Sequence, residues 1–121
     1  MQLNKLVRIL AIAWTIIIFI GCALPGDATP DVITVSDKFK HMAIFALWAF
    51  LWRKASNLSY VSLFVIGTLY GFAIEIYQLV MPINRAFEWL DLVADAVGTL
   101  AGLVFSMWAW PLLERMGLVK P

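Results

Sequence analysis

Polar residues with the potential for chemistry occur in this chain as pairs with helical spacing. Residues three or four positions apart lie on the same side of an α-helix. Carboxylates beside an imidazole are groups that proteins use to hold polar ligands and to transfer protons. Three such pairs are present, and they are Asp37 with His41, Glu75 with Gln78, and Asp91 with Asp95. The spacing therefore predicts a site to which three helices each contribute one pair.

The elements that position these pairs are predicted from the apolar content of the chain. Hydrophobic residues make up 63% of its 121 residues and charged residues only 14%, a composition unlike that of soluble domains. About 20 apolar residues at helical rise cross a bilayer core roughly 30 Å thick. We therefore expect an all-α membrane protein, a single domain over residues 1–121 that forms a compact bundle of four transmembrane helices, at about 6–24, 37–54, 58–81 and 90–113.

The second of these helices has the shortest apolar stretch, from Phe39 to Trp52. A stretch of this length is also typical of a buried or re-entrant helix. Its charged residues can nevertheless lie at the membrane surface, because Lys38 falls in the headgroup layer and Arg53 can extend outward at the other end. We expect this helix to cross the membrane as well.

The distribution of lysine and arginine predicts the orientation of the bundle. Cytoplasmic flanks of transmembrane helices carry an excess of these residues. Six lie at the end with both chain termini and three at the other end, namely Lys5, Arg8, Arg53, Lys54, Arg115 and Lys120 against Lys38, Lys40 and Arg85. Both termini are therefore expected in the cytoplasm, with the polar pairs on the extracytoplasmic side.

Two of the acids should lie well inside the membrane. Glu75 and Asp95 are each five or six residues from the nearer helix end, or roughly 8–9 Å at helical rise. A charge in hydrocarbon costs roughly 2.5–3.5 kcal/mol on insertion scales. These carboxylates should therefore face the interior of the bundle.

The polar residues have a functional interpretation and a structural one. In the first they form an outward-open pocket, with catalytic or proton-transfer roles for Glu75, His41 and Asp91, and binding roles for Asp37, Lys38, Gln78, Arg85 and Asp95. Lys38 and Arg85 would hold an anion. In the second, the same charges neutralise one another and only lock the helices together. Because the carboxylates outnumber Lys38 and Arg85, full neutralisation is difficult, and this favours the functional interpretation.

The sequence identifies no cofactor. A metal ion held by Asp37, His41, Glu75 and Asp95 is chemically feasible, but one histidine without a ligand motif assigns no metal ligand. The net charge of +1 and the lack of a basic run disfavour nucleic acid as a partner. The single cysteine, Cys22, excludes an intramolecular disulfide. It is either a lipidation site after a weak lipoprotein-like signal or a small apolar residue within a helix.

Small residues repeat at helical spacing in two places, as G-x-x-x-G over 67–71 and over 98–102. Such repeats allow helices to approach closely. Contacts inside the bundle are the primary interpretation, and a homo-oligomer face is the alternative. Trp108 and Trp110 are expected in the aromatic belt at the membrane surface.

In combination, the motif residues resemble the VanZ-like family. The resemblance rests on Asp37-Lys38-x-x-His41, Glu75-x-x-Gln78, Pro82-x-x-Arg85, Asp91 and Gly98-x-x-x-Gly102. It covers most of the chain and implies a small protein of the bacterial cytoplasmic (inner) membrane. Members of the family are linked to resistance against glycopeptide and lipoglycopeptide antibiotics such as teicoplanin. The resemblance supplies no reaction. The family commonly has Asn at the position of Asp95, so a second acid here changes the local charge or accepts a proton.

These observations support one leading hypothesis and two alternatives. The leading one is a pocket that binds a membrane lipid or lipid-linked envelope head group, with or without modifying it. A non-enzymatic protein that shields the target from a lipophilic glycopeptide antibiotic is the first alternative. A structural subunit of a membrane complex is the second.

Overall fold

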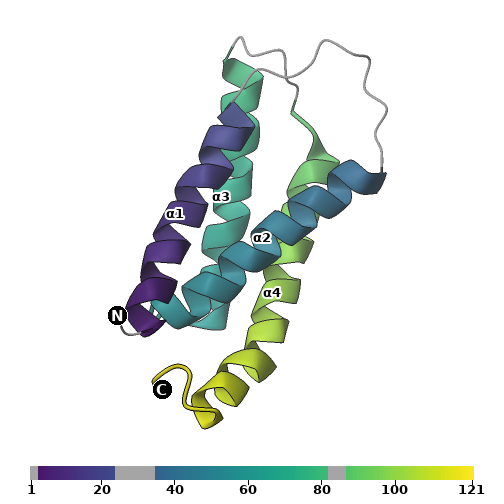
Figure 1. The fold of residues 1–121 in the computed structure, drawn as a ribbon. Helices are drawn as coiled ribbons and strands as arrows, with labels where there is room; N and C mark the ends of the chain where they lie inside the picture. Colours follow the sequence, from purple (N-terminus) through teal and green to yellow (C-terminus); the bar gives the residue numbers. More distant parts are fainter. Residues whose placement is uncertain (1–2, 24–34, 82–86) are drawn as a thin grey trace.

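Four helices make up most of the chain in the computed structural model, which describes residues 3–23, 35–81 and 87–121. They are α1 (Leu3–Ala23), α2 (Val35–Ala55), α3 (Tyr60–Val80) and α4 (Trp89–Arg115), and Figure 1 shows them side by side. These residues contain no β-strand, which confirms the predicted all-α class for the described part. The helix boundaries agree with the prediction to within three residues.

Three of these helices, α1, α3 and α4, are long and apolar enough to cross a membrane. α2 is as long as α1 and α3, but charged residues interrupt it at both ends, with Lys38 and Lys40 in its first turns and Arg53 and Lys54 in its last. The expectation of four membrane-spanning helices is therefore reduced to three candidate spans by length and composition.

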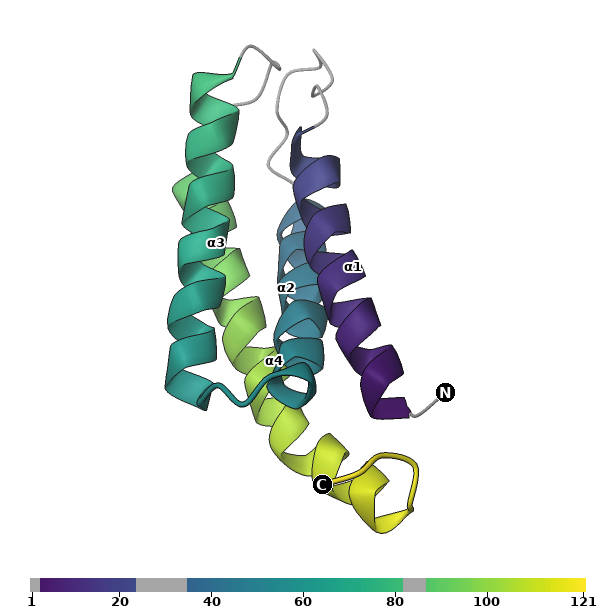
Figure 2. The ribbon, with the colours of Figure 1, turned by 90° about the vertical axis from the view of Figure 1, so that its left-hand side faces the viewer.

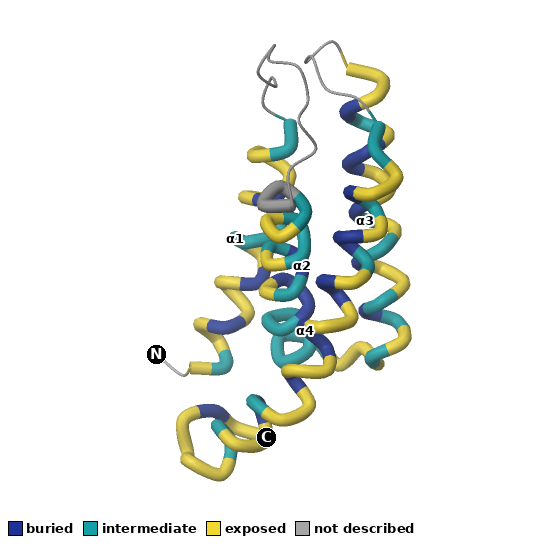
Figure 3. The backbone as a smooth tube through the Cα atoms, turned by 90° about the vertical axis from the view of Figure 1, so that its right-hand side faces the viewer, coloured by how far each residue is buried: buried dark blue, intermediate teal, exposed yellow. Residues whose placement is uncertain are grey.

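α2 is the central helix of the bundle, because it packs against each of the other three and most extensively against α4. Figure 2 shows it between α1 and α3. Phe45, Trp48 and Ala49 on α2 are buried in the main core, together with Leu63 of α3 and Leu103 of α4. Figure 3 shows the same pattern, with buried residues facing inward and exposed ones on the outside of the bundle. Because three helices pack against it, α2 presents little of its surface to the outside of the bundle.

Glycines of α4 bring this helix into backbone contact with α2. A Cβ atom on Gly98 would collide with the backbone of Met42, and one on Gly102 with the backbone of Ala46. The other glycine repeat also faces neighbours within the chain, because a Cβ on Gly67 would lie 2.8 Å from the Thr99 side chain. The predicted packing of both repeats inside the bundle is confirmed.

Indole and phenol groups inside the bundle converge on one threonine of α1. The Nε1 atoms of Trp48 and Trp52 donate hydrogen bonds to the Thr15 hydroxyl at 3.0 and 2.8 Å. The Tyr70 hydroxyl donates to the Thr15 carbonyl at 2.6 Å. These bonds satisfy the polar atoms of aromatic residues that would otherwise be unpaired in an apolar interior.

The start of α1 and the end of α4 lie at the same end of the bundle (Figure 1). Gly117, with φ 76°, turns the chain after α4, a conformation that favours glycine. Val119 is then buried against Val7 and Trp110. The prediction that Trp110 lies in an aromatic belt is wrong, because its side chain is 7% exposed and its Nε1 donates to the Phe50 carbonyl.

Candidate functional site

At the end of the bundle away from the termini, polar side chains from three helices meet in a group that we call the acidic cluster. α2 contributes its first turns, α3 its last third, and α4 its first turns, preceded by its N-cap residue. The members are Lys38, His41, Glu75, Glu88, Asp91 and Asp95. Because positions 88, 91 and 95 follow helical spacing, their carboxylates share one side of α4 and face α2.

Lys38 is held between two carboxylates. Its Nζ lies 2.6 Å from Glu88 Oε2 and also donates a hydrogen bond to Asp91 Oδ1. Burial alone would disfavour the ammonium, but the two carboxylates that contact it offset this cost. Lys38 therefore neutralises part of the acidic cluster.

His41 bridges the two aspartates of α4. Its Nδ1 lies 2.8 Å from Asp95 Oδ1, within hydrogen-bond distance, and its Nε2 lies 3.6 Å from Asp91 Oδ2. A neutral imidazole donates from one nitrogen only, whereas the protonated ring donates from both. The ring is therefore oriented by one carboxylate and placed for proton exchange with another.

Glu75 and Asp95 are the most deeply buried acids. Glu75 is 0% exposed and Asp95 is 1% exposed. Glu75 Oε2 accepts a hydrogen bond from the Glu88 backbone N–H at 3.0 Å. Within the described part of the chain, Glu75 Oε1 and Asp95 Oδ2 are buried without a hydrogen-bond partner. A buried acceptor without a hydrogen bond costs about 1–3 kcal/mol. A hydrogen-bond donor beside these two oxygens would therefore stabilise the protein.

Gly71 allows Asp95 to reach across to α3. A Cβ at position 71 would lie 2.8 Å from Asp95 Oδ2, which is too close for a larger residue. The electrostatic environment of Glu75 includes Asp91, Asp95 and His41. The glycine thus admits an acid of α4 to the space beside Glu75.

Gln78 has a different position from the one its pairing with Glu75 predicts. It is buried, and its Nε2 donates a hydrogen bond to the Cys22 carbonyl at 3.0 Å. Gln78 therefore joins α3 to the end of α1. Arg85 and the side chain of Asp37 lie outside the described residues.

A family model described as VanZ/LLP1 matches residues 6–110, and this span contains every member of the acidic cluster. The chain belongs to the VanZ-like family. No curated protein and no solved structure matches it.

The structure of this VanZ-like chain brings together most of the residues that the motifs predict. Lys38, His41, Asp91 and Asp95 are linked by direct contacts, and Glu75 joins through the Glu88 backbone. The expectation that Lys38 is open to an anion meets an obstacle, because two carboxylates already contact its ammonium.

Glu88 is the member of the acidic cluster that the sequence motifs missed. It is the N-cap residue of α4, and its side chain makes no capping hydrogen bond but contacts Lys38. A signal was present, since Glu88, Asp91 and Asp95 continue one helical face. The helix predicted over 90–113, however, leaves Glu88 in the loop before it.

The described residues offer no group of three or more His, Cys, Asp or Glu side chains arranged to hold a metal ion. Lys38 explains part of this, because its ammonium lies beside the carboxylates of Glu88 and Asp91 where a cation would otherwise bind. What the cluster can offer chemically is hydrogen-bond acceptance and proton exchange.

Proposed function

We propose that the chain is a multi-pass protein of the bacterial inner membrane whose acidic cluster binds the polar head group of a lipid-linked cell-envelope component. One observation carries the proposal, namely the two buried carboxylate oxygens, Glu75 Oε1 and Asp95 Oδ2, that lack a partner among the described residues. Buried acids inside a membrane bundle are costly and are characteristic of functional sites. A ligand that donates hydrogen bonds would satisfy both atoms.

The topology proposed here has all four helices crossing the membrane. α2 is covered by α1, α3 and α4, so only a small part of its surface would meet lipid. Its charged ends extend to the two membrane surfaces. The basic residues concentrated at the terminal end favour a cytoplasmic location for both termini, which places the acidic cluster on the extracytoplasmic side.

The charge of the acidic cluster indicates which ligand groups it would accept. Four carboxylates face one lysine and one histidine. Amines and hydroxyls, which donate hydrogen bonds to carboxylates, therefore suit the cluster, and peptidoglycan-related head groups carry both. An anion contacting Lys38 would have to displace a carboxylate, so Arg85 is the proposed anion contact.

If the bound head group is modified, His41 is the proposed base. An imidazole takes up and releases protons near neutral pH. Asp95 orients the ring, and Asp91 lies beside the opposite nitrogen, an arrangement in which a base is itself held by a carboxylate. Glu75 would accept a hydrogen bond from the ligand.

The test compares Glu75→Gln and His41→Asn with Lys40→Gln in cells whose teicoplanin resistance depends on this chain. Lys40 is an exposed residue of α2 near the acidic cluster. We expect Glu75→Gln to abolish resistance at unchanged membrane abundance and Lys40→Gln to retain it. If His41 is the base of a reaction, His41→Asn abolishes resistance as well. Full resistance in both cluster variants would refute the proposed site.

A non-enzymatic binding protein is the alternative function, and one observation supports it, because Lys38 and His41 are both engaged by carboxylates of the same chain. Such a protein could shield the target of a lipophilic glycopeptide antibiotic without transferring protons. It would tolerate His41→Asn, whose amide can still bond to Asp95, but not an apolar residue at position 41. The pair His41→Asn and His41→Leu therefore separates the two functions.

The proposed orientation is tested by cysteine labelling in intact cells. In a Cys22→Ser background, Lys40→Cys should react with a membrane-impermeant maleimide from outside. Arg115→Cys, exposed at the other end, should react only after the membrane is permeabilised. The reverse pattern would place the acidic cluster in the cytoplasm.

A further inference from the structure

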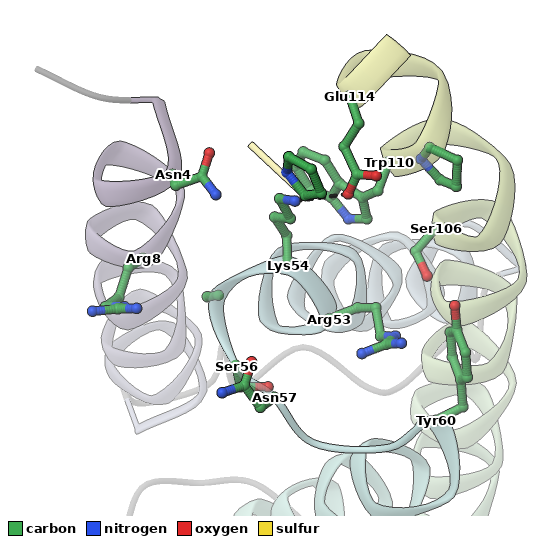
Figure 4. Close-up of a pocket in the computed structure, with 13 residues that line it drawn as sticks. Asn4, Arg8, Arg53, Lys54, Ser56, Asn57, Tyr60, Ser106, Trp110 and Glu114 are labelled. Atoms are coloured by element: carbon green, nitrogen blue, oxygen red, sulfur yellow. Dashed lines mark hydrogen bonds and ion pairs between the residues drawn. The ribbon is translucent and has the colours of Figure 1, made fainter. Parts of the chain in front are cut away.

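A cavity of about 420 Å³ opens at the terminal end of the bundle, opposite the acidic cluster. We call it the basic cavity. Its polar lining includes Arg8, Arg53, Lys54, Ser56, Asn57 and Tyr60. Figure 4 shows α1 on one side of it and α4 on the other, with the end of α2 and the following turn between them. The cavity is therefore built where all four helices end or begin.

The lining carries more positive than negative charge. Among the side chains that line it, three are basic and one, Glu114, is acidic, and Glu114 is paired with Lys54 at 2.8 Å. Arg8 and Arg53 make no ion pair with any residue in the described ranges. An unneutralised pair of guanidinium groups around an open space attracts an anion.

Arg53 has unused hydrogen-bond donors. Its only hydrogen bond within the described residues runs from Nη1 to the Leu58 carbonyl at 3.1 Å, although a guanidinium has five N–H donors. Its Nε is buried without a partner. The group lies 4.2 Å from the centre of the Tyr60 ring, and Figure 4 shows it directed toward that residue. Stacking thus holds the guanidinium in place for a ligand.

We propose that the basic cavity binds a phosphate group, carried by an anionic phospholipid of the adjacent leaflet or free in solution. A fixed guanidinium matches the oxygens of phosphate in a two-point contact. Ser56 and Asn57, which also line the cavity, supply neutral donors. Basic pockets between transmembrane helices are the kind of site that binds anionic lipid head groups. The basic cavity shares no residue with the acidic cluster, so it is independent of the function proposed there.

The test uses the purified full chain and two charge-matched double variants. Arg8→Gln with Arg53→Gln removes two charges from the cavity. Lys5→Gln with Arg115→Gln removes two from exposed positions at the same end that do not line it. Native mass spectrometry counts bound phosphatidylglycerol and, separately, zwitterionic phosphatidylcholine. In a lipid-free arm, the shift of the unfolding temperature with inorganic phosphate is compared with the shift in chloride.

We expect the wild-type chain to retain phosphatidylglycerol over phosphatidylcholine, and the cavity variant to lose roughly tenfold in binding, against about twofold or less for the control. If the cavity binds free phosphate instead, only the phosphate-induced temperature shift will depend on Arg8 and Arg53. Equal lipid retention and equal phosphate shifts in all three proteins would overturn the proposal. Because Arg53 also contacts Tyr60, Arg8→Gln alone provides a variant that removes no hydrogen bond or ion pair among the described residues, and it should lose binding in the same direction.

Discussion

The acidic cluster and the basic cavity lie at opposite ends of α2, and they differ in how their charges are used. In the acidic cluster, Lys38 and His41 are each held by carboxylates of α4 or of its N-cap residue. In the basic cavity, Lys54 is paired but Arg8 and Arg53 face open space. A ligand of the acidic cluster must donate hydrogen bonds to buried oxygens whose neighbours are already bonded to one another. A ligand of the basic cavity enters a space that is already open.

The largest effect is expected when α2 and α4 are forced apart, because both helices contribute residues to the acidic cluster and to the basic cavity. Gly102 lies on α4 between the acidic cluster and the basic cavity, and a larger residue there would collide with the Ala46 backbone. Gly102→Leu should cost about 3 kcal/mol in the free energy of unfolding, measured by denaturation of the purified protein in detergent. Gly21→Ala is the matched control, because nothing lies within 4 Å of a Cβ at Gly21. Equal stability of both variants would contradict the close packing of α2 on α4.

Removing one lysine at each end compares the two regions directly. Lys38→Met leaves the buried carboxylate of Asp91 and that of Glu88 without their cation, and it should destabilise the protein by about 2–3 kcal/mol. Lys54→Met leaves Glu114, whose side chain is 28% exposed, and the exposed Lys120 carbonyl. Both can be hydrated, so the substitution should cost about 1 kcal/mol or less. Unfolding in detergent measures both. A larger loss for Lys54→Met would mean that the basic cavity, and not the acidic cluster, depends more on its ion pairs.

The region between the two ends depends on hydrogen bonds to Thr15. Thr15→Val deprives the indoles of Trp48 and Trp52 of their acceptor, and we expect a loss of about 1–2 kcal/mol. Thr68→Val is the control, because the Thr68 hydroxyl is buried without a partner and its removal should be neutral or stabilising. If the two threonine variants unfold alike, the hydrogen bonds to Thr15 contribute nothing measurable.

The smallest expected effect concerns the aromatic residues beside the basic cavity. Trp110→Phe removes the hydrogen bond to the Phe50 carbonyl and should lower stability by about 1 kcal/mol. Trp108 is 74% exposed, so Trp108→Phe should leave the unfolding midpoint nearly unchanged. Similar unfolding midpoints for the two variants would mean that the hydrogen bond of Trp110 does not stabilise the protein.

The sequence was sufficient to predict the four helices and the members of the acidic cluster that lie within them. Apolar runs set the helix lengths, and pairs such as Asp91 with Asp95 set the face that α4 turns inward. Glu88 was not predicted because the helix expected from the apolar run begins at residue 90, which leaves Glu88 in the preceding loop. An anion contact at Lys38 was also predicted. Whether a carboxylate of the same chain contacts the Lys38 ammonium depends on how the helices pack, and composition does not determine that.

The basic cavity could not be predicted from the sequence for a different reason. Its charged residues come from both ends of the chain and from the end of α2, as with Arg8, Arg53 and Glu114. In the sequence these residues indicate only an excess of positive charge at one membrane surface. Whether they neutralise one another depends on how the helix ends are placed, and that follows from packing at Gly98 and Gly102.

Identification of the molecules that purify with the chain would show most directly whether the acidic cluster binds a polar envelope head group. Mass spectrometry would compare material bound to the wild-type protein, to Glu75→Gln and to the control Lys40→Gln. We predict that an envelope-derived molecule bearing amines or hydroxyls is present with the wild type and the control and is lost from Glu75→Gln. The same bound material in all three proteins, or none in the wild type, would contradict this binding.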